Sequence, residues 1–580
     1  MTYNVCITNL LENSLVVNHR RSAMKKIPIG RSGIKTIVDG NYIYVDKTKE
    51  IKFLIDNYDF AFFSRPRRFG KSLTIDTVET LFTYGVDPYF KNSYIAGKND
   101  DGTPRWNYKT CPVIRLDFSS FTSSPYDLSI FREKFTALLR SYDKKYGMEP
   151  TQLEIDLPQT FDTFVSKLLE KYPGGFVLLI DEYDFNLNSL VDNNDLFEQF
   201  RLEIRNFYSK IKESKISDHI IFMLVTGVTR FKDVAMFSAG SNIRDVTYNS
   251  NLSTIVGYTR EEIEYYFKEY IDAVLEKQFN CKISELDKEK YQYYKNNLLD
   301  NLALNYDNIC YDERGEKSVF STWSINNFFN ETINKEELEF DDYWFESGGI
   351  PTILVKYLQN HLIDFSHFKN KQIVVQSEKF INPTSFQSMD LNVLMAQTGY
   401  LSLTKGYKLK DGAVLSIPNN ELRRALASLT VTNVFENYFT NEKVNIEKYL
   451  AKASVKDLVN KFNEILGKIP RKDAVYNFDD EYSVKNIIQT FLLGANICCY
   501  REVYESIGRP DLVIELKNKI IIVEFKFTKD SNSVQEKLLE GLNQIQSRDY
   551  GQSFDCSKEK LRVAVVYDAC EKKIVAFQEC

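Results

Sequence analysis

Apolar, strand-like runs alternate with segments of helical periodicity between about residues 24 and 275. The runs are YDFAFF, PVIRLDF, FVLLID and HIIFMLVTG, and a helical pattern follows each of the first three. Such alternation favours a mostly parallel sheet covered by helices on both faces, because parallel strands must be joined by crossover connections. This part of the chain is therefore predicted to be an α/β domain.

The turn after the first strand carries residues suited to binding phosphate. In AFFSRPRRFGKSLTIDTVETLF, a strand and a tight turn lead into a helix that opens with Gly70, Lys71 and Ser72. Backbone N–H groups of such a turn surround a β-phosphate, Lys71 would neutralise β/γ charge, and the Ser72 hydroxyl would ligate magnesium. The general pattern has Gly five residues before Gly70, where this chain has Arg65, so the motif match is incomplete.

Two further strand ends extend this hypothesis. In FVLLIDEYD the apolar strand ends in Asp181, which would hold the magnesium shell. Glu182 follows at once and could polarise an attacking water. Acidic residues after a buried strand are common for structural reasons alone, but their pairing with an upstream strand, turn and GKS is much less common. MLVTGVTRF ends its strand with Thr226, which either senses a γ-phosphate or caps the following turn, and the two readings carry equal weight.

The C-terminal hundred residues contain a second group of chemically suited residues. GRPDLVIELKNKIIIVEFKF reads as a hairpin, with Asp511 opening one strand and Glu524 and Lys526 near the end of the next. Residues two apart on a strand project from the same face, so Glu524 and Lys526 are expected side by side, joined by Asp511 across the hairpin. Asp511 and Glu524 could hold one or two magnesium ions, while Lys526 would position or help deprotonate a water.

The spacing alone is weak evidence, because a D-(x12)-ExK pattern occurs by chance in long charged proteins. The surrounding strand makes the hypothesis stronger. IIIVEFK places a carboxylate and an amine on a very apolar strand, which is costly unless the charges are paired or bound to a metal.

Several motifs together resemble one protein family. KKIPIG, YVDKT, SRPRRFGKSL, PVIRLDFS, LLIDEYD, TGVTRF, YWFESG and QTGYLSL look like the AAA-ATPase-like family, whose usual C-terminal partner resembles a PD-(D/E)xK nuclease. The family's own loop reads RPRRFGKS, so Arg65 agrees with the family while departing from the general pattern. The resemblance gives Arg67 and Arg68 candidate roles, either in contacting phosphates or in pairing with acidic neighbours.

The resemblance also suggests accessory positions in the C-terminal domain. Gln544 and Tyr550 are expected on the helix after the Glu524 strand as support for the site, although Gln544 could equally be a polar residue on the helix surface. Glu481 or Glu502 could supply a further carboxylate. The chain departs from the family's usual acidic helix near residues 484–489, so the third metal ligand is unassigned.

The predicted fold class is α/β multidomain: a P-loop NTPase parallel sheet, a helical and winged-helix-like middle, and a C-terminal restriction-endonuclease-like α/β domain. The expected boundaries are a flexible extension at 1–23, the P-loop ATPase core at 24–258, a helical lid or linker at 259–385, a winged-helix-like region at 386–475 and the nuclease-like domain at 476–580.

Composition narrows the choice of partners and compartment. The formal net charge of −6 shows no basic surplus, so any contact with DNA must be local. The four histidines are not in metal-ligand spacing and the nine cysteines form no CxxC pair, which favours reduced thiols in the cytoplasm. No apolar run approaches the ~20 residues needed to cross a bilayer, and the N-terminus lacks the pattern of a secretory signal.

Two functions from different classes fit these observations. The first is an ATP-binding, Mg2+-dependent nuclease that acts on DNA, with the P-loop module regulating or powering cleavage. The second is a nucleotide-dependent switch or scaffold with little or no nuclease activity. A homo-oligomer is compatible with both functions.

Overall fold

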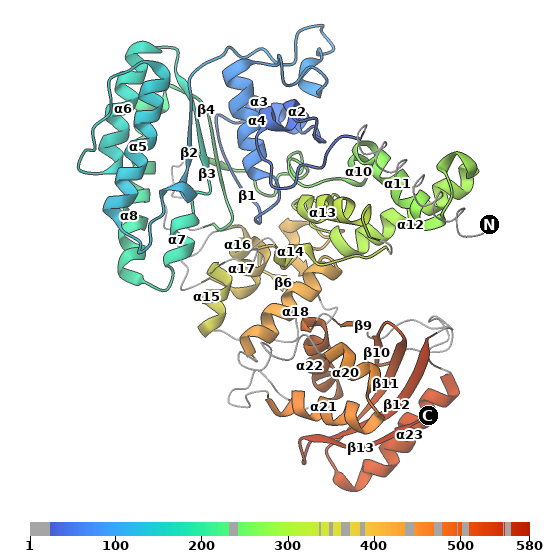
Figure 1. Ribbon diagram of the computed structural model, residues 1–580. Coiled ribbons are helices and arrows are strands. Elements are labelled where there is room, and N and C mark those ends of the chain that lie inside the picture. The colour runs from blue at the N-terminus through green and yellow to red at the C-terminus, as the bar shows by residue number, and fades with distance from the viewer. Residues whose placement is uncertain are drawn as a thin grey trace, which may run out of the picture. The chain divides into compact units, whose positions relative to one another are not determined.

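The computed structural model of the 580-residue chain divides into two compact units (Figure 1). Unit 1 comprises Met1–Ile353 and Val374–Leu415, and unit 2 comprises Leu354–Ile373 and Ser416–Cys580. The structure describes residues 24–230, 242–335, 338–346, 352–360, 372–382, 389–434, 446–468, 478, 480–495, 497–500, 510–548, 550 and 558–580.

Unit 1 is built on a five-stranded sheet whose strands are all parallel. Its order is β2-β3-β4-β1-β5, so β4 lies between β1 and β3. The parallel sheet predicted from the strand-helix alternation is thus confirmed. The strands are β1 (Phe60–Ser64), β2 (Val113–Asp117), β3 (Phe176–Asp181), β4 (Ile220–Gly227) and β5 (Arg244–Asp245).

Helices cover both faces of this sheet, as the crossover connections require. Figure 1 shows α3 and α4 on one side and α5, α6 and α8 on the other. Every residue of β3 is buried, which agrees with the unbroken apolar run in its sequence. The helices are α2 (Ile34–Asp39), α3 (Thr48–Asn57), α4 (Lys71–Tyr84), α5 (Leu128–Tyr146), α6 (Leu157–Lys171), α7 (Phe185–Leu190), α8 (Asn194–Ile211) and α9 (Ser214–Ser217).

A second apolar core of unit 1 is helical. It joins the start of the described chain, at Ile27, Ile43 and Val45, to helices from the region predicted as a lid or linker. The first of these helices begins with a capping box between Thr259 and Glu262, which satisfies otherwise free backbone N–H groups. The helices are α10 (Arg260–Tyr266), α11 (Lys268–Phe279), α12 (Lys288–Tyr306), α13 (Thr322–Thr332) and α14 (Tyr343–Glu346).

The region predicted as winged-helix-like contains helices and part of a small sheet of order β6-β8-β7. The division between the two units falls inside this region, at Leu415 and Ser416, and its expected boundaries stay predictions. Its elements and their neighbours are α15 (Thr352–Asn360), β6 (Ile373–Val375), α16 (Ser377–Ile381), α17 (Leu391–Gln397), β7 (Ser402–Leu403), β8 (Ala413–Ser416) and α18 (Asn420–Val434).

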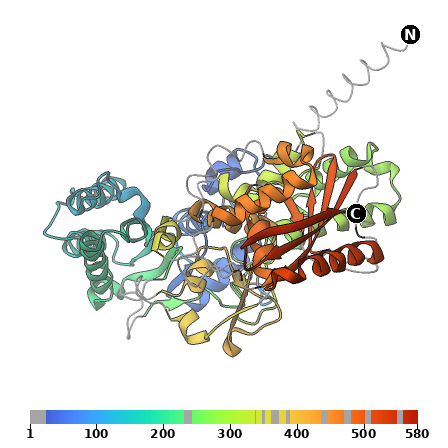
Figure 2. The same cartoon turned by 90° about the horizontal axis from the view of Figure 1, so that it is seen from below.

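Unit 2 contains a mixed five-stranded sheet of order β13-β12-β11-β10-β9. Strands β11 and β12 are parallel because α23 crosses between them, and the other neighbours are antiparallel. Figure 2 shows α23 on one face of the sheet and α21 and α22 on the other. The elements are α20 (Ile446–Lys452), α21 (Val455–Lys468), α22 (Glu481–Gly494), β9 (Cys498–Tyr500), β10 (Leu512–Glu515), β11 (Lys519–Thr528), α23 (Val534–Arg548), β12 (Glu559–Asp568) and β13 (Lys573–Glu579).

Alternation along β11 decides which side chains meet α23. Ile520 and Ile522 belong to one apolar cluster with Leu542 and Ile545 of α23, so the even-numbered residues face this helix. Glu524 and Lys526 continue the same face toward the end of the strand. Apolar packing between β11 and α23 therefore holds in place the strand that carries Glu524 and Lys526.

The described residues include no helix that is both long enough and apolar enough to cross a membrane.

Candidate nucleotide and nuclease sites

The loop between β1 and α4 has the backbone shape of a phosphate cradle. Gly70 caps α4 with a φ of 95°, a left-handed conformation that is strained for residues with a Cβ. The ammonium group of Lys71 donates to the carbonyl oxygens of Arg65 and Pro66, both at 2.9 Å. Burial lowers the pKa of Lys71, against the opposing charges of Glu182 and Asp181.

Arg65 points away from this cradle and anchors the loop. Its guanidinium donates to the carbonyl oxygens of Ser64 at 2.8 Å and Thr247 at 2.7 Å, and lies 4.0 Å from the centre of the Tyr311 ring. Burial lowers the pKa of Arg65 to about 10, so the group stays charged at neutral pH. The positive φ angles of the loop occur at Arg68 and Gly70, so position 65 needs no glycine.

A cavity of about 450 Å3 lies beside the loop in unit 1. Six of the predicted residues line it: Arg67, Arg68, Gly70, Lys71, Ser72 and Glu182. The guanidinium of Arg67 lies over the Phe185 ring, and that of Arg68 lies 4.3 Å from the centre of the Trp323 ring. Both arginines therefore stand on aromatic supports at the cavity wall.

Asp181 and Thr226 are not among the residues that line the cavity in the described part of the chain. The Thr226 hydroxyl donates to Oδ1 of Asp181 at 2.6 Å, and Arg115 lies 3.5 Å from Oδ2. Strand β4 thus carries a hydroxyl that orients the carboxylate at the end of β3, a contact that neither interpretation of Thr226 included.

Glu182 lies at the cavity in a left-handed backbone conformation, with a φ of 50°. Burial raises the pKa of its carboxyl above the ordinary value, and Lys71 opposes this shift. A higher pKa makes the carboxylate a stronger proton acceptor, which suits the predicted action on a water molecule.

Asp184 is a residue of this site that the sequence reasoning missed. Its carboxylate is buried and accepts hydrogen bonds from the backbone N–H groups of Val228 and Thr229, and from the Asn188 amide at 2.8 Å. It therefore ties the loop after β3 to the loop after β4. The second aspartate in the sequence DEYD was the available signal.

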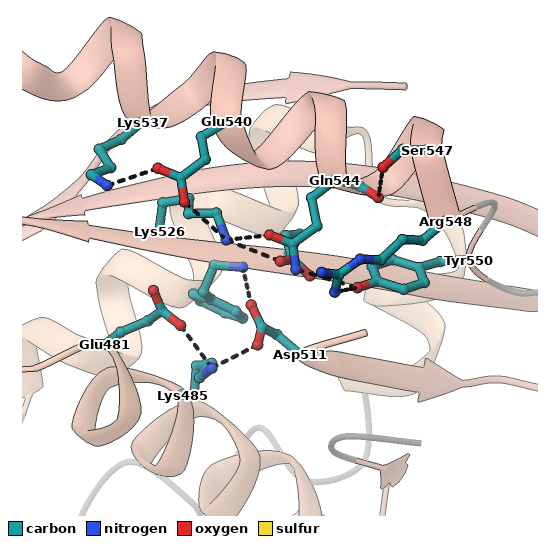
Figure 3. Close-up of polar contacts among 12 residues, drawn as sticks. Glu481, Lys485, Asp511, Lys526, Lys537, Glu540, Gln544, Ser547, Arg548 and Tyr550 are labelled. Carbon is teal, nitrogen blue, oxygen red and sulfur yellow. Dashed lines mark hydrogen bonds and ion pairs between the residues drawn. The ribbon is translucent and has the colours of Figure 1, made fainter. Parts of the chain in front are cut away.

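The C-terminal triad forms where β10 and β11 meet. Leu512 pairs with Val523, which brings Asp511 close to Glu524. Lys526 donates to Oε1 of Glu524 at 3.0 Å, as expected for neighbours on one face of a strand. Asp511 accepts from the backbone N–H of Phe525 at 2.8 Å (Figure 3). The structure thus brings all three predicted residues together.

Glu524 is the most unusual group of this site. Its side chain is 1% exposed, and Oε2 is buried without a hydrogen-bond partner among the described residues. Burial, assisted by the charge of Asp511, raises the pKa of Glu524 to about 7. A buried carboxylate oxygen without a partner is energetically costly, and a divalent cation would satisfy it. The donor set of Asp511 and Glu524 therefore fits the expected Mg2+.

The predicted accessory residues support Lys526. Gln544 on α23 accepts from the Lys526 ammonium at 2.8 Å, and its own amide lies 3.3 Å from the Tyr550 hydroxyl. Arg548 also donates to that hydroxyl, at 2.9 Å. Tyr550 was expected on α23, but the helix ends at Arg548, two residues before it.

Lys485 is a second residue that the sequence reasoning missed. It lies on α22, is only 6% exposed, and donates to Oδ1 of Asp511 at 2.7 Å and to Glu481 at 2.9 Å (Figure 3). These carboxylates raise the pKa of Lys485 although burial alone would lower it. The sequence shows the i, i+4 spacing of Glu481 and Lys485, but not that folding brings them close to Asp511.

The third metal ligand stays unassigned. Glu481 reaches the site through Lys485, and Glu502 lies outside the described residues. No group of three or more histidine, cysteine or acidic side chains suited to a metal ion occurs in the described parts of the chain.

The fold and these sites define a two-part protein: a P-loop-type α/β unit and a unit with a nuclease-type mixed sheet. Residues 28–237 match the family model described as "Predicted AAA-ATPase", and residues 480–578 match that of the PD-(D/E)XK nuclease superfamily. The chain thus carries an AAA-ATPase-like domain and a C-terminal PD-(D/E)XK nuclease superfamily domain.

A relative resembles the chain over nearly its full length. It is described as an uncharacterized protein in the vnfD 5′ region of Azotobacter chroococcum mcd 1, and is 25% identical over 569 residues. The match covers 95% of this chain and 98% of the relative, so the similarity extends across both matched domains. No solved structure matches the chain.

Proposed function

We propose that the protein is an ATP-binding, Mg2+-dependent nuclease that acts on DNA, and that its P-loop module regulates or powers the C-terminal nuclease. The observation that carries this proposal is the close arrangement of Asp511 with the buried Glu524 and Lys526, in which one oxygen of Glu524 has no hydrogen-bond partner among the described residues. An arrangement this costly is expected where a cation completes it.

Each residue of the nuclease site has a role that its contacts support. Asp511 and Glu524 would hold Mg2+, which would supply Lewis-acid activation of a water and of the scissile phosphate. Lys526, kept in place by Gln544, orients the attacking water and offsets negative charge that develops on the phosphate. Arg548 at the end of α23 offers positive charge near the site for the DNA backbone (Figure 3).

The nucleotide-site roles follow the geometry of the cavity. Gly70 and the α4 N-terminus receive the β-phosphate, Lys71 and the Arg67–Arg68 pair receive β/γ charge, and Ser72 holds Mg2+. Asp181, oriented by the Thr226 hydroxyl, would supply a carboxylate ligand to this Mg2+, and Glu182 would polarise the attacking water. Lys71 would exchange its two backbone carbonyl partners for phosphate oxygens.

The cellular setting is also a proposal. Six of the nine cysteines are free thiols in the structure, which supports a reducing, cytoplasmic compartment.

The test compares Asp511→Ala and Lys526→Ala with the wild-type protein on linear, circular and single-stranded DNA with Mg2+, with and without ATP. Both variants should lose cleavage by at least about a hundredfold while they still bind ATP, because the two sites use different residues. Lys537→Ala is the matched control, since Lys537 forms an exposed ion pair with Glu540.

Cleavage by the two site variants at the wild-type rate would overturn the site assignment. A wild-type protein that binds ATP but cuts none of the three DNA forms would favour the second function, a nucleotide-dependent switch or scaffold.

A further inference from the structure

A positively charged side chain lies where the nuclease site would receive its cation. The Lys485 ammonium donates to Oδ1 of Asp511, while Oδ2 is already held by the Phe525 N–H. Asp511 therefore has its two oxygens occupied by donors. Glu524 differs, because its Oε2 has no such partner among the described residues.

The charges around the site are nearly balanced without a metal. Glu481, Asp511 and Glu524 face Lys485 and Lys526 at distances of 2.7 to 3.0 Å. A divalent cation that binds Asp511 and Glu524 would stand close to two ammonium groups in a partly buried setting, where like charges repel strongly. Lys526 is turned toward Glu524 and Gln544, so Lys485 is the ammonium that faces Asp511.

Lys485 also has a second partner ready. Glu481 lies one helical turn before it on α22, and already accepts from its ammonium at 2.9 Å. The Glu481 side chain is 35% exposed, whereas that of Asp511 is 14% exposed. Lys485 can therefore give up Asp511 and keep a carboxylate partner at the solvent side of the site.

We propose that Lys485 is a positioning residue that competes with the divalent cation for Asp511, so that cation binding shifts Lys485 onto Glu481. This inference rests on the proposed function only in that Asp511 and Glu524 bind the cation. Lys485 holds the empty site together and lowers its affinity for the metal.

The probe is Mn2+ binding to the full chain, followed by the loss of the free-ion paramagnetic resonance signal, without nucleotide or DNA. Lys485→Met should bind Mn2+ about tenfold more tightly than wild type, because one repelling charge is removed. Lys485→Arg, which keeps the charge, should restore the wild-type affinity. Lys537→Met should leave the affinity unchanged, and Asp511→Asn should abolish the gain of Lys485→Met.

A second variant keeps the inference testable if Lys485→Met does not fold. Glu481→Gln should weaken Mn2+ binding severalfold, because Lys485 then has only Asp511, and unchanged or tighter binding by this single variant would overturn the inference. Where Lys485→Met folds, the loss should disappear in that background. A loss that persists in that background would identify Glu481 as a ligand and overturn the inference. Equal or weaker binding by folded Lys485→Met would overturn it as well.

These outcomes separate the inference from the proposed function. If the variants shift Mn2+ affinity as expected but the protein cuts no DNA, the nuclease proposal fails and the role of Lys485 stands. If the protein cuts DNA but Lys485→Met leaves Mn2+ affinity unchanged, the nuclease proposal stands and the role of Lys485 fails.

Discussion

At the scale of single residues, the buried carboxyl of Glu524 should make the stability of the candidate nuclease site depend on pH. Its neighbours with charge are Asp511 across the hairpin, Lys526 on the same strand and Lys485 on α22. Burial and Asp511 favour the protonated form, and the two lysines only partly offset them. The folded metal-free site therefore holds a proton that the unfolded chain releases at lower pH.

The sign of the resulting stability change follows from proton linkage. The pKa of Glu524 is about 7 in the folded protein against 4.5 for the free side chain, so between these values the native state binds more protons. The free energy of unfolding should then fall as pH rises from about 4.5 to 7. Urea unfolding of the metal-free protein should show this fall in the transition of unit 2, relative to Glu524→Gln.

If the free energy of unfolding of Glu524→Gln depends on pH as strongly as that of wild type, Glu524 is not the group responsible. Saturating Mg2+ should also reduce the difference between the two proteins, because the cation stabilises the ionised carboxylate.

Site residues could be predicted from the sequence where a local sequence pattern pointed to them. Glu524 and Lys526 needed only the period of a strand, and Lys71 needed only the step from strand to helix. Lys485 and Asp184 could not be found this way, because each acts on a partner that folding brings near from another element. Both are buried charges, and burial is a property of the packed chain.

At the scale of elements, the alternation of strands and helices predicted the parallel sheet of unit 1, but not the position of β4 within it. Its place between β1 and β3 lets Thr226 reach Asp181, a contact across strands that no spacing encodes. Likewise, Arg65 looked like a defect in a phosphate-binding pattern. Its side chain instead joins the end of β1 to residues 247–252, which follow β5.

Restoring the general pattern should therefore harm the protein. Arg65→Gly removes a buried guanidinium with two close carbonyl partners and a ring contact, and leaves the Thr247 carbonyl without its donor. We expect a loss of roughly 2–4 kcal/mol in the stability of unit 1. Thermal unfolding measures this loss, with the exposed Lys91→Gly as the control for a substitution outside the loop.

A melting temperature equal to that of wild type, together with tighter ATP binding, would show that Arg65 is not an anchor.

At the scale of the whole molecule, two sites of different chemistry occur in one chain. The candidate nucleotide cavity belongs to unit 1 and the candidate nuclease triad to unit 2, so any coupling must pass between units. The sequence predicted both domains, because each has a motif set of its own. The division between the units at Leu415 and Ser416 was not predicted from the sequence, because such a boundary depends on which helices pack together in the folded chain.

Lys71→Ala tests the coupling. The variant should lose ATP binding by at least about tenfold, since the ammonium supplies the phosphate-binding charge, yet keep Mg2+-dependent cleavage in the absence of ATP. ATP should then no longer alter its cleavage rate. A variant that keeps the full wild-type response to ATP would show that the cavity does not control the nuclease.

The most direct measurement of the central claim is DNA cleavage by Lys526→Ala in Mg2+, beside wild type and Lys537→Ala. The account predicts cleavage by wild type and Lys537→Ala, and a loss of at least about a hundredfold in Lys526→Ala with ATP binding intact. Cleavage by Lys526→Ala at the wild-type rate would contradict it.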